Sequence, residues 1–487
     1  MKRIVNALSK LNWGKRACAV LGLCATTAIS LPAQIATLTT LYRFVCYQNV
    51  CPDGAGSKAG LVQTTNGGLY GTTYGGGANG YGTVFRITPG GTLTTLYSFC
   101  SHSGCTDGAD SFARLVQATN GDLYGTTYSG QGIDYGTVFK ITPSGTLTTL
   151  HSFCSQTNCA DGSGPVAELV QAANGSLYGT TAYGGAGGSA GTIFKITPSG
   201  TLTTLYSFCS QPYCRDGENP VVGLVQAANG DFYGTTPNGG ANGHGTVFKI
   251  TPAGTLTTLH SFKASTDGAV PSGGLVQAAN GDFYGTAVGV GANNFGTVFK
   301  ITPGGTLTTL YRFCSQANCT DGSGPSGGLV QATDGDLYGT TEYGGANGVG
   351  TVFRISPGGA LTTLYSFCFL TQSGCTDGNE PYTGLVQDTN GDFYGTTGDT
   401  IFRLSVGLGP FVKGRPVSGE VGTAVEILGT DLNGATSVSF NGTAATFTVA
   451  SRYLITTTVP AGASTGPIQV VTPNRTLSSN GSFRVLP

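Results

Sequence analysis

The sequence has few charged residues, one tryptophan, one methionine and four histidines. Aspartate, glutamate, lysine and arginine together make up only 10% of its 487 residues. It contains no His-Glu-x-x-His metal motif and no phosphate-binding loop. These absences give little support to an enzyme, and none to a metal or a nucleotide cofactor.

The N-terminus is typical of a secretion signal. Five basic residues precede or border a short apolar run at 17–29, and Leu31-Pro32-Ala33 offers a small-residue cleavage site. The alternative is a membrane anchor, but the run is too short to span a bilayer comfortably. We therefore expect a signal peptide over 1–33, export, and no transmembrane segment after cleavage.

The residues after position 33 carry 18 basic and 24 acidic side chains, a net charge of about −6. Nucleic-acid binding needs a basic face, so nucleic acid is excluded as a partner. Cleavage also removes the only tryptophan, Trp13, which is the side chain best suited to stacking on sugars.

Glycine is abundant instead, at 81 residues. Such a content occurs in disordered and fibrous chains, but 39% hydrophobic residues argue against disorder. The glycines stand at fixed points between short β-type runs, so we interpret them as turn residues.

A repeat organises most of the chain. The triplet Leu-Val-Gln recurs at spacings of 54, 54, 55, 51, 54 and 56 residues. Its seven copies begin at Leu61, Leu115, Leu169, Leu224, Leu275, Leu329 and Leu385.

Each unit contains four strand-like runs with alternating apolar and Thr/Ser residues. They are GLVQA, LYGTT, GTVFKI and TLTTLYSF or close variants, separated by an Asn-Gly or Asp-Gly turn, a Gly-rich loop and a Thr-Pro-Gly-Gly turn. Four antiparallel strands every ~50 residues predict a β-propeller blade.

The two ends of the repeat region favour a closed ring. A lone fourth strand stands first, at 37–44, and the seventh unit stops after its third strand, at Leu404. In a ring the lone strand completes the last blade and removes exposed sheet edges. We therefore expect an all-β chain with a seven-bladed β-propeller over 37–404, closed by its N-terminal strand.

Twelve cysteines lie in pairs between the fourth strand of one unit and the first strand of the next. Even counts at fixed spacing in an exported protein indicate disulfides. Unit five lacks both cysteines, as a bonded pair predicts. The expected bonds are Cys46–Cys51, Cys100–Cys105, Cys154–Cys159, Cys209–Cys214, Cys314–Cys319 and Cys368–Cys375.

The cysteine loops and the Gly-rich loops should share one face of the disc, and two sets of residues stand out there. The first is an aspartate before glycine, eight residues ahead of each Leu-Val-Gln. A ring of seven carboxylates would suit a cation, whereas the alternative is that each aspartate caps its own turn. They are Asp53, Asp107, Asp161, Asp216, Asp267, Asp321 and Asp377.

The second set consists of aromatic residues in the Gly-rich loops. They would either stack on a ligand or pack between neighbouring blades. They are Tyr74, Tyr81, Tyr128, Tyr135, Tyr183, Phe295 and Tyr343.

A different domain follows a short linker at 405–410. Residues 411–487 contain several β-type runs with Gly, Asn and Pro turns, which predict a small β-sandwich. VGTAVEILGTDL, VSFNGTAATF and LITTTVPAGASTGPIQVVTPN resemble an IPT/TIG domain, which implies an immunoglobulin-like fold.

The repeats also resemble a family. LVQAANGDFYGTT followed by GTVFKITPAGTLTTLHSF is similar to the GloVer tandem repeat of exported bacterial proteins, many of the choice-of-anchor type. The resemblance implies a secreted, periplasmic or cell-surface bacterial protein and no assigned activity. A further similarity to NHL-type blades implies that Leu-Val-Gln is innermost.

We expect an exported, non-catalytic binding module that recognises an extracellular polysaccharide, peptide or protein on its loop-rich face. Two alternatives stay open: a hydrolase or lyase acting on an extracellular polymer at the same face, and a structural envelope protein. The four histidines favour no catalytic site, because they occupy different repeat positions.

Overall fold

The computed structural model describes residues 36–486, except 49, 131–134, 187, 228, 290–294, 369 and 372–373. The expected signal peptide lies outside these residues. The described chain is built of β-strands, with four single-turn 3-10 helices: η1 (Ser103–Cys105), η2 (Thr157–Cys159), η3 (Pro212–Cys214) and η4 (Ala317–Cys319). None of its helices is long and apolar enough to cross a membrane.

Each repeat supplies the four expected strands. The first strands are β2 (Val62–Gln63), β6 (Val116–Gln117), β10 (Val170–Gln171), β14 (Val225–Gln226), β18 (Val276–Gln277), β22 (Val330–Gln331) and β28 (Val386–Gln387). The second are β3 (Leu69–Thr72), β7 (Leu123–Thr127), β11 (Leu177–Thr181), β15 (Phe232–Thr236), β19 (Phe283–Ala287), β23 (Leu337–Thr341) and β29 (Phe393–Thr396). The third are β4 (Thr83–Ile87), β8 (Thr137–Ile141), β12 (Thr192–Ile196), β16 (Thr246–Ile250), β20 (Thr297–Ile301), β24 (Thr351–Ile355) and β30 (Thr400–Ser405). The fourth are β5 (Leu93–Ser98), β9 (Leu147–Ser152), β13 (Leu202–Ser207), β17 (Leu256–Ser261), β21 (Leu307–Arg312), β25 (Leu361–Ser366) and the N-terminal β1 (Thr37–Arg43).

These strands form four-stranded antiparallel sheets in the order first, second, third, fourth. The first strand is shorter than the GLVQA run expected for it. Its ladder to the second strand covers only Val and Gln, as in Val116↔Tyr124 and Gln117↔Leu123. The next residue, Ala118, already belongs to the hairpin turn, because its N–H and C=O bond to Asp122 and Gly121.

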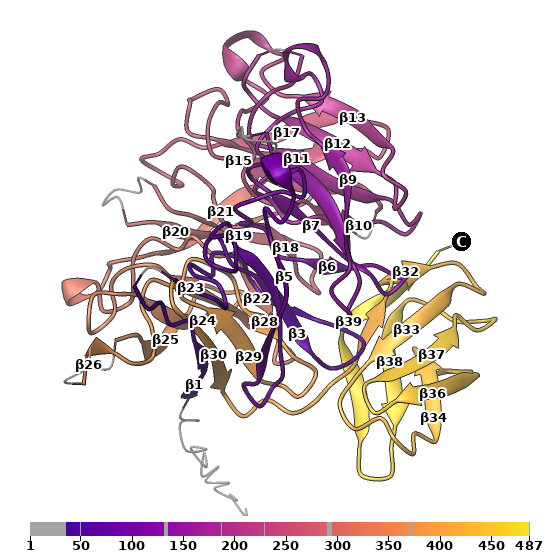
Figure 1. The fold of residues 1–487 in the computed structure, drawn as a ribbon. Helices are drawn as coiled ribbons and strands as arrows, with labels where there is room; N and C mark the ends of the chain where they lie inside the picture. The colour runs from indigo at the N-terminus through magenta and orange to yellow at the C-terminus, as the bar shows by residue number, and fades with distance from the viewer. Residues whose placement is uncertain are drawn as a thin grey trace, which may run out of the picture. The chain divides into compact units, whose positions relative to one another are not determined.

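The N-terminal strand completes the last sheet. β1 pairs antiparallel with β30, from Thr37↔Ser405 to Arg43↔Thr400, in the sheet order β1-β30-β29-β28. Figure 1 shows β1, in indigo, beside β30 and β29, in orange. The last repeat thus obtains its fourth strand from the start of the repeat region, as the sequence predicts.

The apolar core lies between consecutive sheets. One cluster joins Tyr70 and Phe99 of the first repeat to Leu115 and Phe139 of the second, all of them buried. Equivalent clusters follow along the chain, and one more joins the last sheet to the first through Tyr394, Ile401, Leu61 and Phe85. The second strands are buried on both faces because a sheet packs on each side of them. The clusters therefore close a ring of sheets, which is the arrangement of a β-propeller.

Polar contacts repeat at the same interfaces. Gln117 accepts a hydrogen bond from the N–H of Thr65, in the preceding repeat, and donates to the carbonyl of Gly121 in its own turn. Gln63 accepts in the same way from Thr389, across the closure of the ring. The glutamine of Leu-Val-Gln thus ties neighbouring first strands together, which places them at the inner edge.

The expected disulfides are present in the cysteine loops. They are Cys46–Cys51, Cys100–Cys105, Cys154–Cys159, Cys209–Cys214, Cys314–Cys319 and Cys368–Cys375. The last of these loops also carries a short hairpin of β26 (Leu370–Thr371) and β27 (Gly374–Cys375).

The C-terminal region is a two-sheet sandwich. One sheet contains β31 (Lys413–Arg415), β33 (Ala424–Leu428), β37 (Leu454–Thr458) and β36 (Phe447–Ser451). The other contains β32 (Ser418–Gly419), β39 (Thr476–Val485), β38 (Gly466–Val471), β34 (Ser437–Phe440) and β35 (Thr443–Ala445). Their facing side chains, including Val425, Ile427, Phe440 and Ile468, form a separate core.

Candidate functional site

The loops that follow the second strands lie against the segments that follow the cysteine loops. Bridges such as Ala55↔Gly75 and Ser323↔Tyr343 pair the two segments in the same repeat. The second residue before a third strand then reaches the next repeat, as where the carbonyl of Tyr81 accepts from the N–H of Asp110. Hydrogen bonds within repeats and between neighbouring repeats therefore hold the loops of the loop-rich face in place.

The seven aspartates bond within their own loops. Each carboxylate accepts from the tyrosine or histidine near the end of the preceding fourth strand. The pairs are Tyr42–Asp53 (2.5 Å), Tyr97–Asp107 (2.7 Å), His151–Asp161 (3.0 Å), Tyr206–Asp216 (2.8 Å), His260–Asp267 (2.7 Å), Tyr311–Asp321 (2.8 Å) and Tyr365–Asp377 (2.7 Å). Backbone N–H groups of the same loop also donate to several of these carboxylates, as Ser101 does to Asp107 at 2.8 Å. His151 and His260 make the contact that tyrosine makes elsewhere.

The electrostatics of Asp107 agree with these contacts. Burial alone would raise the pKa of Asp107, but hydrogen bonds from the Tyr97 hydroxyl and from the Ser101 N–H and hydroxyl hold that pKa below the ordinary value. Conversely, burial and the charge of Asp107 help to raise the pKa of Tyr97 to about 12. The carboxylate is thus ionised and satisfied by its own loop.

The aromatic residues do not act as one group. Tyr74 and Tyr128 both pack on Phe112, with ring centroids 4.7 and 5.7 Å away. Tyr183 lies next to Tyr128, since both rings flank Gly164. Tyr343 is instead hydrogen-bonded to Glu342, which raises the pKa of Tyr343 to about 12.

The other three aromatic residues contribute through the backbone. The carbonyls of Tyr81, Tyr135 and Phe295 each accept an N–H from the following repeat. The side chains of Tyr81 and Phe295 are partly exposed, at 45% and 39%.

A cluster that the sequence analysis missed lies on this face. The Lys58 ammonium sits 5.2 Å from the ring centroid of Tyr74, 5.6 Å from that of Phe112 and 5.7 Å from that of Tyr382. The Tyr382 hydroxyl donates to Glu380 at 2.7 Å. We call Lys58, Tyr74, Phe112, Tyr382, Glu380 and Glu342 the Lys58 cluster.

Its two glutamates influence each other. Burial is the main cause that raises the pKa of Glu342; the charge of Glu380 raises it further, and the charge of Lys58 opposes the rise. The hydrogen bond to Glu380, followed by burial, raises the pKa of Tyr382. Three aromatic faces, one cation and two carboxylates therefore share one surface.

Variation within the repeat is the signal that would have found this cluster. The third residue before Leu-Val-Gln takes five identities in the seven units, and lysine, phenylalanine and tyrosine each occur there once. These residues are Lys58, Phe112, Val166, Val221, Ser272, Ser326 and Tyr382.

A second charged feature lies just before two of the first strands. Arg114 and Glu168 form a salt bridge of 2.7 Å, and both side chains are about 40% exposed. The equivalent position is glycine in the other five repeats, for example Gly60, where an added Cβ would lie 3.3 Å from Arg114 and 3.5 Å from the Gly384 carbonyl. This ion pair therefore lies at the inner edge of the ring.

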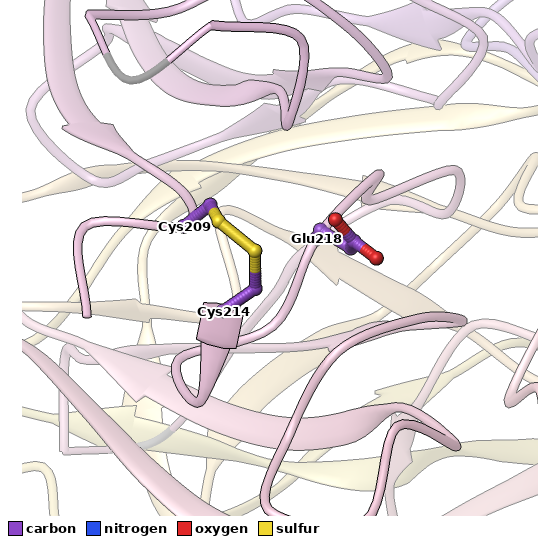
Figure 2. A group of neighbouring side chains, drawn as sticks. All are labelled: Cys209, Cys214 and Glu218. Carbon is purple, nitrogen blue, oxygen red and sulfur yellow. A yellow bond between two sulfur atoms is a disulfide. The ribbon is translucent and has the colours of Figure 1, made fainter. Parts of the chain in front are cut away.

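Two other groups contain the residue types of a metal site or of a nucleophile elbow, but not in the arrangement that such sites need. Figure 2 shows Cys209, Cys214 and Glu218 close together, but the two sulfurs are bonded to each other and offer no thiolate to a metal. Ser464 lies in a Gly-x-Ser-x-Gly stretch at 462–466 between β37 and β38, whereas a nucleophile elbow joins a strand to a helix. The same spacing around Ser189 falls in the loop between β11 and β12.

Surface hollows also lie elsewhere. One of about 330 Å³ is lined by His102, Asp107 and Thr149, and one of about 240 Å³ is lined by Lys413, Ile468 and Phe483. No residue of the Lys58 cluster lines either hollow. Lys58 and Tyr74 are exposed on the surface.

Solved structures of similar fold come from proteins with different activities. A fungal alcohol oxidase in complex with copper is 12% identical, with a TM-score of 0.51 over 93% of this chain and 99% of that one. The extracellular domain of a protein named as a hybrid two component system from Bacteroides thetaiotaomicron is 11% identical, with a TM-score of 0.49 over 80% of this chain. This chain covers 46% of that structure. An auxiliary nutrient binding protein from the same organism is 12% identical, with a TM-score of 0.39 over 76% of each chain. At 12% identity, the match to the alcohol oxidase shows the fold alone.

Family models identify both parts of the sequence. The IPT/TIG domain model matches residues 414–485, and the Gloeobacter/Verrucomicrobia repeat model matches residues 27–214 and 210–405. No curated protein matches the chain. The resemblances to the tandem repeat and to the IPT/TIG domain are thereby confirmed. The repeat matches extend over most of the sequence, and the chain belongs to the Gloeobacter/Verrucomicrobia repeat family, with an IPT/TIG domain after the repeats.

Proposed function

We propose that the chain is an extracellular binding protein and that its loop-rich face recognises a polysaccharide, peptide or protein. The contact surface is the Lys58 cluster, and the IPT/TIG domain acts as a spacer or a second contact.

The disulfides support an extracellular location. Six of them lie in short loops of the described chain, and bonds of this kind persist in oxidising compartments. The basic and apolar N-terminal residues, with their small-residue cleavage site, are the corresponding export signal.

The observation that carries the proposal is where the repeats differ. The strands are nearly identical from unit to unit, whereas the Lys58 cluster combines residues found at their positions in only one or two units. Packing between nearly identical repeats does not require different residues at these positions, so packing alone does not explain the differences. Aromatic side chains with adjacent charges on rigid loops are typical of recognition surfaces.

The test is retention of the purified protein on bacterial and plant polysaccharides and on envelope extracts. We expect saturable retention that falls roughly fivefold or more in Tyr74→Ala and Phe112→Ala, because stacking on each ring contributes of order 1 kcal/mol or more. Tyr213→Ala is the matched control, because Tyr213 is 90% exposed and lies on a cysteine loop outside the cluster.

Each other outcome has a defined meaning. Retention that is unchanged in both variants would place binding elsewhere and overturn the proposal. Absence of retention on every material would favour the structural envelope protein, and depolymerised glycan in the supernatant would identify a hydrolase or lyase.

A further inference from the structure

The Lys58 cluster has the geometry of an aromatic cage. Its three rings come from three different sheets: Tyr74 follows β3, Phe112 precedes β6 and Tyr382 precedes β28. All three centroids lie within 6 Å of one ammonium nitrogen, which is the range of a cation–π contact. The three sheets are joined by buried clusters, so the segments that carry the rings are held near one another by contacts that do not involve Lys58.

The cage is occupied by a residue of the chain itself. Lys58 is exposed and reaches the rings from the segment before β2, on a four-carbon stem with several rotatable bonds. A lysine at this position can leave the cage for water at little cost. Its ammonium marks the place where a cation fits.

The acidic residues favour replacement by another cation. Glu342 and Glu380 raise the negative charge beside the rings, and the cluster has one cation for two carboxylates. The charge of Glu342 is also partly offset by Lys58, so departure of Lys58 leaves a site that is both aromatic and anionic. Neutral sugars gain nothing from this excess charge, and acidic ligands are repelled by it.

We propose that the cage of Tyr74, Phe112 and Tyr382, with Glu342 and Glu380, binds an alkylammonium group of the ligand, and that Lys58 is its displaceable internal occupant. Aromatic cages prefer quaternary or methylated ammonium, because such cations are weakly hydrated and lose little on entering. The inference rests on the proposed function and assigns a chemical class to the ligand.

The test is isothermal titration calorimetry of the mature protein with tetramethylammonium, choline and n-butylamine. The neutral control ligand is 3,3-dimethylbutanol, which has the shape of choline without its charge. We expect tetramethylammonium to bind Lys58→Ala roughly three- to tenfold more tightly than wild type, because the internal competitor is gone. Lys263→Ala, which removes an exposed lysine from the loop without cysteines, should bind like wild type.

Two further variants test the cage itself. Adding Phe112→Ala to Lys58→Ala should weaken binding by roughly two- to fivefold for the ring removed, and adding Glu380→Gln should weaken it as well. Choline binding without n-butylamine binding assigns the site to quaternary ammonium, and similar affinity for both assigns it to amines in general. Unaltered melting temperatures would exclude unfolding as the cause.

Equal affinity of Lys58→Ala and wild type, or equal affinity for choline and its neutral analogue, would overturn the cage. If polymer retention then still depends on Tyr74 and Phe112, the loop-rich face binds a ligand of another class and the proposed function stands. If retention is also lost from the whole panel, both proposals fail.

Discussion

The hydroxyl of Thr396 donates a hydrogen bond to the backbone carbonyl of Ala59 at 3.1 Å, although the two residues are 337 positions apart. The same contact joins consecutive repeats elsewhere, as between Thr126 and Ala167 at 3.2 Å. The first threonine of each Gly-Thr-Thr therefore ties its sheet to the next, and the last sheet is tied to the first by the same bond as all the others.

This equivalence leads to a prediction about Thr396→Val. The substitution keeps the shape of the side chain, but it leaves the buried Ala59 carbonyl without its donor and breaks the bond to the Thr383 hydroxyl. It should therefore lower the free energy of unfolding by about 1–2 kcal/mol. Chemical denaturation of the purified protein measures the change. Thr126→Val breaks the equivalent bond to Ala167 inside the ring and should cost no more than Thr396→Val. A much smaller effect at Thr396 would show that the closure is looser than the other interfaces.

Deletion of residues 36–44 should have a far larger effect. It removes β1 and Phe44, which together cover the open edge of β30 and pack in the cluster between the last and first sheets. We expect aggregation, or dimers that pair through β30, because an uncovered edge strand is a template for association. Size-exclusion chromatography with light scattering distinguishes these results from a soluble monomer, which would contradict closure by β1.

The disulfides should contribute modestly and separately. Replacing Cys100 and Cys105 together by alanine should lower the free energy of unfolding by ~2 kcal/mol, since the bond closes a loop of only about six residues. The loop over 263–267 dispenses with a disulfide, and there Lys263 N–H still bonds Asp267 at 2.7 Å. We therefore expect the double variant to fold and melt at a lower temperature. Failure to fold at all would show that this disulfide is needed to form the loop.

Acid should destabilise the protein partly through Asp107. Its pKa in the folded state is below the ordinary value, because hydrogen bonds from Tyr97 and Ser101 outweigh the effect of burial. The ionised carboxylate therefore stabilises the fold above about pH 4, and this contribution is lost as the pH falls through the folded-state pKa. In Asp107→Asn the loss of stability relative to wild type should shrink from pH 6 to pH 3. Glu420→Gln, at an exposed position, is the control for charge alone. If the free energies of unfolding of Asp107→Asn and wild type differed by the same amount at pH 6 and pH 3, the pKa of Asp107 would not change on folding.

Much of the fold follows from local patterns in the sequence. Alternating apolar and Thr/Ser runs and turn dipeptides identify the strands, because both are local patterns. The lone strand predicted at 37–44 identifies the partner of the last repeat, because that repeat lacks a fourth strand of its own. The cysteine pairs were equally visible, since their spacing is local. The short length of the first strand was not visible in the sequence, because it is set by the hydrogen bonds of the glutamine and of the turn that follows.

The candidate site depends on contacts that no local pattern contains. Lys58, Phe112 and Tyr382 meet only because their sheets are neighbours in the closed ring, and Tyr382 is 324 positions from Lys58. Choosing aromatic residues by loop type found Tyr74, but it also gathered Tyr81, whose carbonyl bonds the next repeat, and Phe295, which belongs to the fifth repeat. Departures from the repeat, compared unit by unit, hold more information about such a site than residue type does.

The pairing of β1 with β30 also has a consequence for the order of events in folding. The first strand of the ring to be synthesised has no partner until the third strand of the last repeat has followed it, more than 350 residues later. Contacts of such long range slow folding, and they leave the earlier sheets as an open array until the end. A chain of this design stays incomplete during its synthesis, and it becomes a ring only when its last repeat arrives.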